Sequence, residues 1–283
     1  MKRHLPIALL PLLVMACGEP EEGANGGEPL TLHFKAQVGD QPFACGTTYE
    51  GLGATNTHFE PFDFRLYVSA IELQSADGRW EPLQLEQDNP WQHENLALLD
   101  FEDASGACAN GTTETRDIVE GYWDLDGVQV LRFEIGVPFE WNHIDASTAP
   151  SPLNQTALFW NWLGGYKFIR LEGATAGLDT GWQFHLGSTA CQPGPGGGAS
   201  SCDNENRVIV ELSDFDPHRD QIVFDVAALV ETADLDSHQE NSPRGCMAGP
   251  DDGDCAALFE ALGLPFQGDP GGTQRFVRLE PGE

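Results

Sequence analysis

The sequence predicts an all-β protein, an antiparallel β-sandwich with disulfide-stapled loops and one short helix. Hydrophobic and polar residues alternate in many short runs, which is the pattern of half-buried strands. The 32 glycines and 19 prolines cluster with Asn and Asp between these runs and supply the turns that separate them. The seven cysteines suit an exported chain whose loops are held by disulfides. Many short strands joined by turns favour a sandwich or barrel.

The first 17 residues have the features of an export signal. Lys2 and Arg3 precede an apolar stretch, 5–14, that is too short to span a bilayer as a helix. The letters VMAC that follow (14–17) resemble a bacterial lipoprotein signal, in which Cys17 becomes the lipidated first residue of the mature protein. An ordinary signal peptide that ends in a cysteine is the alternative.

The segment after this signal is expected to be a flexible tether. Residues 18–29 consist mainly of Gly, Pro and Glu, a composition that does not form a packed core. No break in composition divides 30–280, so we predict one domain there. We expect this domain to be anchored by its lipid to a membrane, in the periplasm or on the cell surface. Gly18 in place of Asp after the cysteine favours the outer membrane.

The first expected strand of the domain is 30–38, where apolar residues alternate with polar ones. Runs of the same kind predict further strands at 62–73, 128–137, 166–172, 182–186, 207–212, 222–229 and 274–279. One helix is expected at 256–262, with Asp254 as its cap and Gly263 as its stop. The predicted secondary structure is therefore mostly β.

Six cysteines remain once Cys17 is assigned to the lipid. No two of them form a CxxC pair, so disulfides are favoured over a thiolate metal site. Six cysteines allow 15 pairings, and the sequence does not choose among them. The short Gly/Pro-rich loops 191–202 and 246–255 favour two local bridges, which leaves one long-range bridge. The expected disulfide cysteines are Cys45, Cys108, Cys191, Cys202, Cys246 and Cys255.

The charge of the chain excludes one class of partner. Asp and Glu number 45 against 14 Lys and Arg, which gives a formal net charge of -31. A nucleic-acid partner is therefore not expected, because phosphates are neutralised by a basic face. The acidic runs 100–103 and 251–254 could bind Ca²⁺ through oxygen ligands, although neither has the spacing of an EF-hand. Solvated loop acids are the simpler interpretation.

Two histidines each follow a tryptophan by two positions. Trp91 precedes His93, and Trp141 precedes His143. In an extended chain, residues i and i+2 project to the same face, so each pair would present an indole and an imidazole to one site. Imidazoles with aromatic neighbours and no convergent thiolates suit Cu or Zn.

A third histidine, His185, falls on the opposite face of its predicted strand from Trp182 and Phe184. These two apolar neighbours are expected to pack in the core while His185 points elsewhere. A single histidine is more often a surface or hydrogen-bonding residue than a ligand. Only convergence of two or three histidines would make a metal site.

A family resemblance extends over residues 30–279. The motif LFWNW (158–162), followed by GYKF (165–168) and LEG (171–173), resembles the signature of the MbnP family of exported copper-binding proteins. This family is also called the metallo-mystery pair four-Cys proteins. Further pieces fit the pattern in order: ALLDFED (97–103), GVPF (136–139), NH (142–143), APSPLN (149–154), HLGS (185–188) with Cys191, and CM (246–247) followed by 250–255.

The resemblance implies an exported, mostly β protein that binds one copper ion. It also implies a partner, a di-haem c-type protein similar to MauG, which oxidises a tryptophan of the copper protein to kynurenine. The chain would then be the substrate of that partner and not an enzyme. We expect Trp91 to be the modified residue, with Trp141 as the alternative. Trp160 and Trp162 are expected to pack in the core.

The ligands implied by the resemblance are His93 and His143, with His185 as the third. Two other functions remain open from the sequence. One is a surface module that binds Ca²⁺ and carbohydrate through its acidic loops. The other is an enzyme that uses copper or paired carboxylates, although no nucleotide-binding loop or GxSxG elbow is present.

Overall fold

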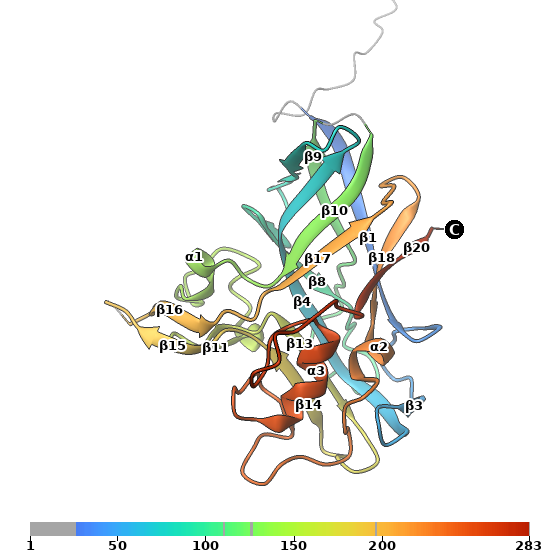
Figure 1. Ribbon diagram of the computed structural model, residues 1–283, viewed down its shortest axis with the longest axis vertical. Coiled ribbons are helices and arrows are strands. Elements are labelled where there is room, and N and C mark those ends of the chain that lie inside the picture. The colour runs from blue at the N-terminus through green and yellow to red at the C-terminus, as the bar shows by residue number, and fades with distance from the viewer. Residues whose placement is uncertain (1–26, 110, 125–126, 196, 283) are drawn as a thin grey trace, which may run out of the picture.

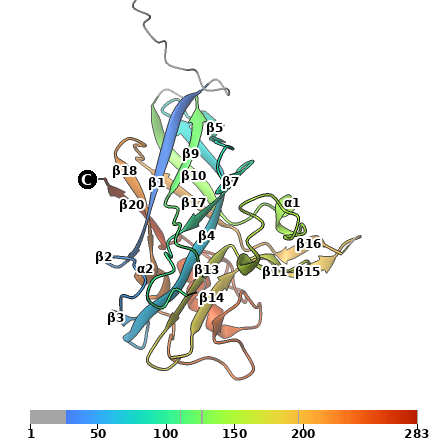
Figure 2. The same cartoon turned by 180° about the vertical axis from the view of Figure 1, so that it is seen from behind.

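The structure is a computed structural model that describes residues 27–109, 111–124, 127–195 and 197–282. Strands account for 44% of the residues and helices for 8%, which confirms the all-β class. The predicted signal peptide lies outside the described residues. Strand β1 (Glu28–Val38) begins within the segment expected as a tether, because Glu28 and Pro29 already pair with strand β9 (Ile118–Trp123). Two large open sheets and two small hairpins make up the fold (Figures 1 and 2).

The first sheet has six strands around β1, which pairs antiparallel with β9 and parallel with β18. Alternate side chains of β1, including Leu30, Leu32 and Phe34, are buried, as the alternating pattern predicts. Its other strands are β20 (Val277–Pro281), β18 (Asp220–Asp225), β6 (Gln84–Leu85) and β2 (Gln41–Pro42).

The second sheet has ten strands and is built on β4 (Thr57–Ser75), a strand of 19 residues. Its inner face packs on the first sheet, where the ring of Phe34 lies 6.0 Å from that of Phe133. The remaining strands are β17 (Val208–Ser213), β10 (Val128–Ile135), β13 (Ile169–Ala174), β14 (Trp182–Leu186), β19 (Gly245–Cys246), β3 (Tyr49–Leu52), β5 (Trp80–Pro82), β8 (Leu96–Asp100) and β7 (Gln92–His93).

The described residues contain three short α-helices where one was expected. The strand predicted at 222–229 ends at Asp225, and helix α2 (Val226–Val230) follows. The Asp225 carboxylate accepts hydrogen bonds from the amides of Ala227 and Ala228. This side-chain cap satisfies amides that would otherwise have no partner, and it converts an apolar run with strand-like composition into a helix.

The predicted helix at 256–262 is confirmed as α3 (Ala256–Ala261), with Gly263 at a positive φ of 70° after it. Its expected cap was wrong. A 3₁₀ turn (Gly253–Cys255) precedes α3, and Asp252 accepts from the amide of Asp254. A second 3₁₀ turn spans Thr156–Leu158. No helix in the part of the chain that the structure describes is long and apolar enough to cross a membrane.

All three expected disulfides are confirmed: Cys45–Cys108, Cys191–Cys202 and Cys246–Cys255. The second bridge joins β15 (Thr189–Pro193) to β16 (Ala199–Asn204) in a hairpin. This hairpin projects from the body of the protein beside helix α1 (Phe139–Asn142) and the small β11 (Phe159–Asn161) and β12 (Gly165–Tyr166) hairpin (Figures 1 and 2). The family motifs around 142 and 160 therefore meet at one projecting corner.

Candidate metal centre

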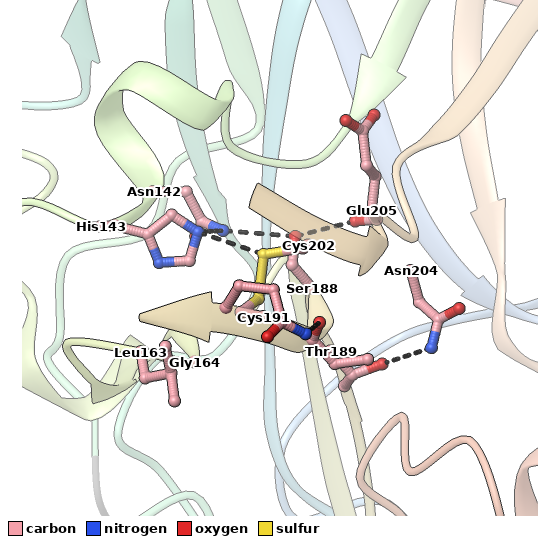
Figure 3. Close-up of a disulfide and its surroundings, with 12 residues drawn as sticks. Asn142, His143, Leu163, Gly164, Ser188, Thr189, Cys191, Cys202, Asn204 and Glu205 are labelled. Atoms are coloured by element: carbon pink, nitrogen blue, oxygen red, sulfur yellow. Dashed lines mark hydrogen bonds between the residues drawn. A yellow bond between two sulfur atoms is a disulfide. The ribbon is translucent and has the colours of Figure 1, made fainter. Parts of the chain in front are cut away.

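His143 lies at this projecting corner, directly after the last residue of α1. Its Nδ1 is 3.3 Å from the carbonyl oxygen of Trp162. Its Nε2 is 3.3 Å from the side-chain amide of Asn142 and 3.5 Å from Sγ of Cys202. Figure 3 shows the ring turned toward the disulfide. A carbonyl oxygen only accepts, so Nδ1 carries the proton and Nε2 carries the lone pair.

The surroundings of His143 also keep its imidazole neutral. Partial burial lowers the pKa of His143, and the hydrogen bond to the Trp162 carbonyl raises it by less. No carboxylate is among its hydrogen-bond or ion-pair partners within the described residues. In this tautomer the Nε2 lone pair accepts from the Asn142 amide, and a neutral imidazole that has its lone pair on Nε2 is a form of histidine that binds metals.

Cys191 and Cys202 stand opposite each other on β15 and β16. Their sulfur atoms and one nitrogen of His143 all lie within 4.8 Å of one another. Over the described ranges, this is the one group of three potential metal ligands that are this close. Sulfur in a disulfide is not a thiolate, so in the oxidised protein His143 is the strong ligand of the group.

A cavity of about 490 Å³ adjoins the disulfide. We call it the Trp160 hollow, and it is lined by Trp160, Asn161, Leu163, Gly164, Ser188, Thr189, Ala190, Cys191 and Met247. Met247 and Trp160 are both half-buried at its wall. The core packing expected for the two motif tryptophans is only partly correct, because Trp160 packs against the core while Trp162 is 47% exposed.

Sequence reasoning missed Met247 and did not assign Trp160 to the site. Met247 follows a disulfide cysteine and lies 87 positions beyond Trp160 (247 − 160), so no local pattern links the two. The motif itself was the available signal, since LFWNW and CM were both recognised as family pieces. Only the fold brings the Met247 thioether and the Trp160 indole to the wall of one cavity.

His93 lies in β7 and contacts Trp141, with ring centroids 4.8 Å apart and planes at 79°. Its Nε2 is buried and has no hydrogen-bond partner. The expected pairing of Trp141 with His143 on one face was wrong, because Trp141 lies in α1. In a helix, residues i and i+2 point about 200° apart. The structure therefore brings His93 to Trp141, and it places Trp91 partly buried against the core.

His185 lies in a buried network of charges on β4, β13 and β14. Its Nε2 is 2.6 Å from Oε1 of Glu172, whose two oxygens also accept from Arg170 at 2.8 and 3.1 Å. Burial raises the pKa of Glu172, but the hydrogen bonds from His185 and Arg170 have the larger combined effect and lower this pKa to about 2. His185 does not belong to the group around His143, and its Nε2 is already bound to a carboxylate.

The acidic run 100–103 joins the same network. Asp100 and Glu102 are 3% and 0% exposed, so the expectation that the acids of this run are solvated was wrong for these two, whereas Asp103 is exposed. Glu102 lies 3.9 Å from the guanidinium of Arg65, which is also bound to Asp63. These carboxylates balance buried arginine charge, which a sequence run of acids does not reveal. In the other run, Asp252 is likewise buried.

The buried position of Asp100 predicts a pH-dependent stability. Burial raises the pKa of Asp100 to about 7, against the lowering effect of Arg65. A raised pKa means that the folded state holds this proton more tightly, so its contribution to stability is lost as pH rises from about 4 to about 7, by up to about 1.4 kcal/mol per pH unit.

We expect Asp100→Asn to flatten the dependence of the unfolding free energy on pH in that window, measured by urea titration. Asp179→Asn, at an exposed position, is the matched control and should leave the slope unchanged. An unaltered slope in Asp100→Asn would contradict this assignment.

A family model described as MbnP matches residues 27–248. The structure is similar to that of MbnP from Methylosinus trichosporium, with a TM-score of 0.80 and 28% sequence identity, over 90% of this chain and 99% of that chain. Comparison with curated protein sequences gives no match. Because the family model matches more than half of the chain, the chain belongs to the MbnP family.

Proposed function

We propose that this protein is an exported copper-binding lipoprotein that takes up one copper ion between His143 and the Trp160 hollow. The observation that carries this proposal is the donor set at one corner of the fold. The Nε2 lone pair of His143 faces the Cys191–Cys202 disulfide, and the hollow beside that disulfide contains the thioether of Met247. Imidazole and thioether together suit copper, and Cu(I) in particular.

An oxidised tryptophan in this hollow would add polar groups next to the copper. Trp160 lines the hollow, and its indole N–H is a donor that cannot bind a metal. Opening the indole to kynurenine replaces this N–H with an aromatic amine and a ketone. We propose that a di-haem c-type partner of the MauG type supplies the oxidising equivalents, so the chain is a substrate and not an enzyme.

The di-haem partner must dock close to the tryptophan that it oxidises, and the surface beside Trp160 is suited to such docking. Trp162 and Leu163 are 47% and 37% exposed, two of the three large apolar side chains at the surface of the described residues. Exposed apolar residues next to each other are typical of interaction sites. Anchoring through Cys17 to the outer membrane would hold this corner in the periplasm or at the cell surface.

A second location for copper rests on His93 and Trp141. The buried Nε2 of His93 has no hydrogen-bond partner, which is unusual for a buried polar atom and leaves a lone pair available. Trp141 is in contact with that ring. The Trp160 hollow is favoured because the Met247 thioether lines it and the disulfide beside it faces Nε2 of His143, whereas within the described residues His93 belongs to no group of three potential ligands.

The proposal is tested by producing the full chain with and without its di-haem partner. We expect one equivalent of copper only after coexpression, measured by elemental analysis. Peptide mass spectrometry should then find, on Trp160, the net loss of one carbon and gain of one oxygen that kynurenine formation produces.

Two matched variants locate the site. Trp160→Phe should lose both the copper and the modification, and Trp141→Phe should lose neither. Modification of Trp91 or Trp141 instead would move the site to His93. Coexpressed protein that takes up no copper would overturn the proposed function.

A further inference from the structure

The three disulfides differ in how accessible they are to a reductant. Cys108, Cys246 and Cys255 are fully buried, so two of the bridges each contain at least one inaccessible sulfur. Cys191 and Cys202 are both partly exposed, on the hairpin that projects from the body (Figure 1). Thiol–disulfide exchange requires access of a thiolate to a sulfur. Cys45 is also partly exposed, but its partner Cys108 is buried. Cys191–Cys202 is the bridge in which both cysteines are partly exposed, so we expect a dithiol reductant to open it first.

Opening this bridge would leave two thiols beside a histidine. Cys191 and Cys202 are directly opposite in an antiparallel pair, so their side chains project to the same face of the hairpin. His143 Nε2 is 3.5 Å from Sγ of Cys202 (Figure 3), and the three ligand atoms lie within 4.8 Å of one another.

These separations are close to what a tetrahedral metal site requires. With metal–sulfur bonds of about 2.3 Å, two thiolates on one tetrahedral ion lie about 3.8 Å apart. The Cα atoms of Cys191 and Cys202 are 3.8 Å apart, and the Cβ atoms of a disulfide are about 3.8 Å apart, so rotation about the side-chain bonds can set the two sulfur atoms at that spacing without moving the strands. The hairpin therefore needs only side-chain rotation to release the S–S bond and hold an ion.

The histidine is already held in the orientation of a ligand. The Trp162 carbonyl fixes the proton on Nδ1, the arrangement by which a second group orients a metal-binding histidine. Asn142 is held in turn, since its Oδ1 accepts from the amide of Tyr166 at 2.8 Å and its Nδ2 donates to Ser188 at 3.3 Å. None of these contacts involves the disulfide, so they persist when it is reduced.

We propose that reduction of Cys191–Cys202 creates a second metal-binding state, in which His143, Cys191 and Cys202 hold a thiolate-preferring cation such as Zn(II) or Cu(I). A dithiol reductant gives two electrons and two protons to the S–S bond and is itself oxidised to a disulfide. The cation then displaces the two thiol protons as its two bonds to sulfur form. The site shares His143 with the proposed copper site but requires no oxidised tryptophan.

The test uses the full chain produced without the di-haem partner, so that it can fail independently of the proposed function. The protein is treated with a dithiol without oxygen, freed of reductant by gel filtration, and titrated with Co(II) as the probe. We expect thiol alkylation to map to Cys191 and Cys202. One equivalent of Co(II) should then produce thiolate-to-cobalt charge-transfer absorption, and oxidised protein should produce none.

Variants assign the ligands. Cys191→Ser with Cys202→Ser should abolish the charge-transfer absorption. His143→Gln should keep it but weaken Co(II) affinity by more than about tenfold, because loss of a ligand exceeds the effect of losing a supporting group. His238→Gln, at an exposed histidine, is the matched control and should bind as the unaltered protein does.

Three results would overturn the proposal. The first is absence of charge-transfer absorption in the reduced protein. The second is His143→Gln binding Co(II) as tightly as the unaltered protein. The third is alkylation of the other four cysteines before Cys191 and Cys202. The order of alkylation is measured on the unaltered protein, so this result does not depend on whether the serine variants fold.

Discussion

His143→Gln is expected to lower copper affinity by more than about 100-fold in protein coexpressed with the di-haem partner, since a ligand is lost and not merely a supporting group. Glutamine is similar in length to histidine but has no imidazole lone pair at the position of Nε2. His143 is partly exposed and follows the end of a helix of four residues, so the unfolding free energy should change by only about 0.5 kcal/mol. Copper competition against a chelator measures the affinity.

His93→Gln is the matched control for this prediction. Its Nε2 is buried without a partner beside Trp141, yet the donor set around the Trp160 hollow does not include it. We expect copper binding to be retained in this variant. If His93→Gln loses copper while His143→Gln keeps it, the copper site lies between β7 and α1 instead.

Glu172→Gln is expected to lower the unfolding free energy by about 3–5 kcal/mol, the range for breaking a buried ion pair by removing one partner. The Glu172 side chain is 8% exposed and binds Arg170 at 2.8 Å and His185 at 2.6 Å. Neutralising it leaves the guanidinium of Arg170 with one carboxylate, that of Asp63 at 3.2 Å, and with the carbonyl oxygen of Ala157. Urea unfolding at neutral pH measures the loss.

A surface pair provides the control. Glu280 accepts from Lys35 at 3.1 Å, and both side chains are about one-third exposed. Glu280→Gln should change the unfolding free energy by less than about 1 kcal/mol. An equal effect of the two substitutions would show that burial of the Glu172 network contributes nothing beyond a surface contact.

The pH dependence of the Glu172 effect follows from its lowered pKa. Because the pKa of Glu172 is about 2 in the folded protein, below the usual value near 4.3, its stabilising contribution is present above about pH 4. That contribution is lost as pH falls toward 2. The stability difference between Glu172→Gln and the unaltered protein should therefore shrink in acid.

Period-two alternation predicted long strands such as β1, β4 and β10, because a half-buried strand carries its own signature. It did not predict β8, which is buried at every position and so has no alternation, nor β9, β15 and β16. It failed at 222–229, where the apolar run has the composition of a strand and only the Asp225 cap makes its second half a helix. Alternation also placed Trp141 and His143 on one face, which holds only for an extended chain. Trp141 lies within helix α1 and His143 directly follows it, so the two side chains do not share a face.

The sequence by itself determined the all-β class and the family motifs, and its short Gly/Pro-rich loops favoured two local disulfides that the structure confirms. These features are local or depend on counting residue types. The tertiary structure alone decided that His143 meets Cys202, that Met247 shares a cavity with Trp160 and that His185 binds Glu172. Each of these contacts joins residues on different elements, and side-chain convergence across strands depends on sheet order and register, which no local pattern of residues encodes.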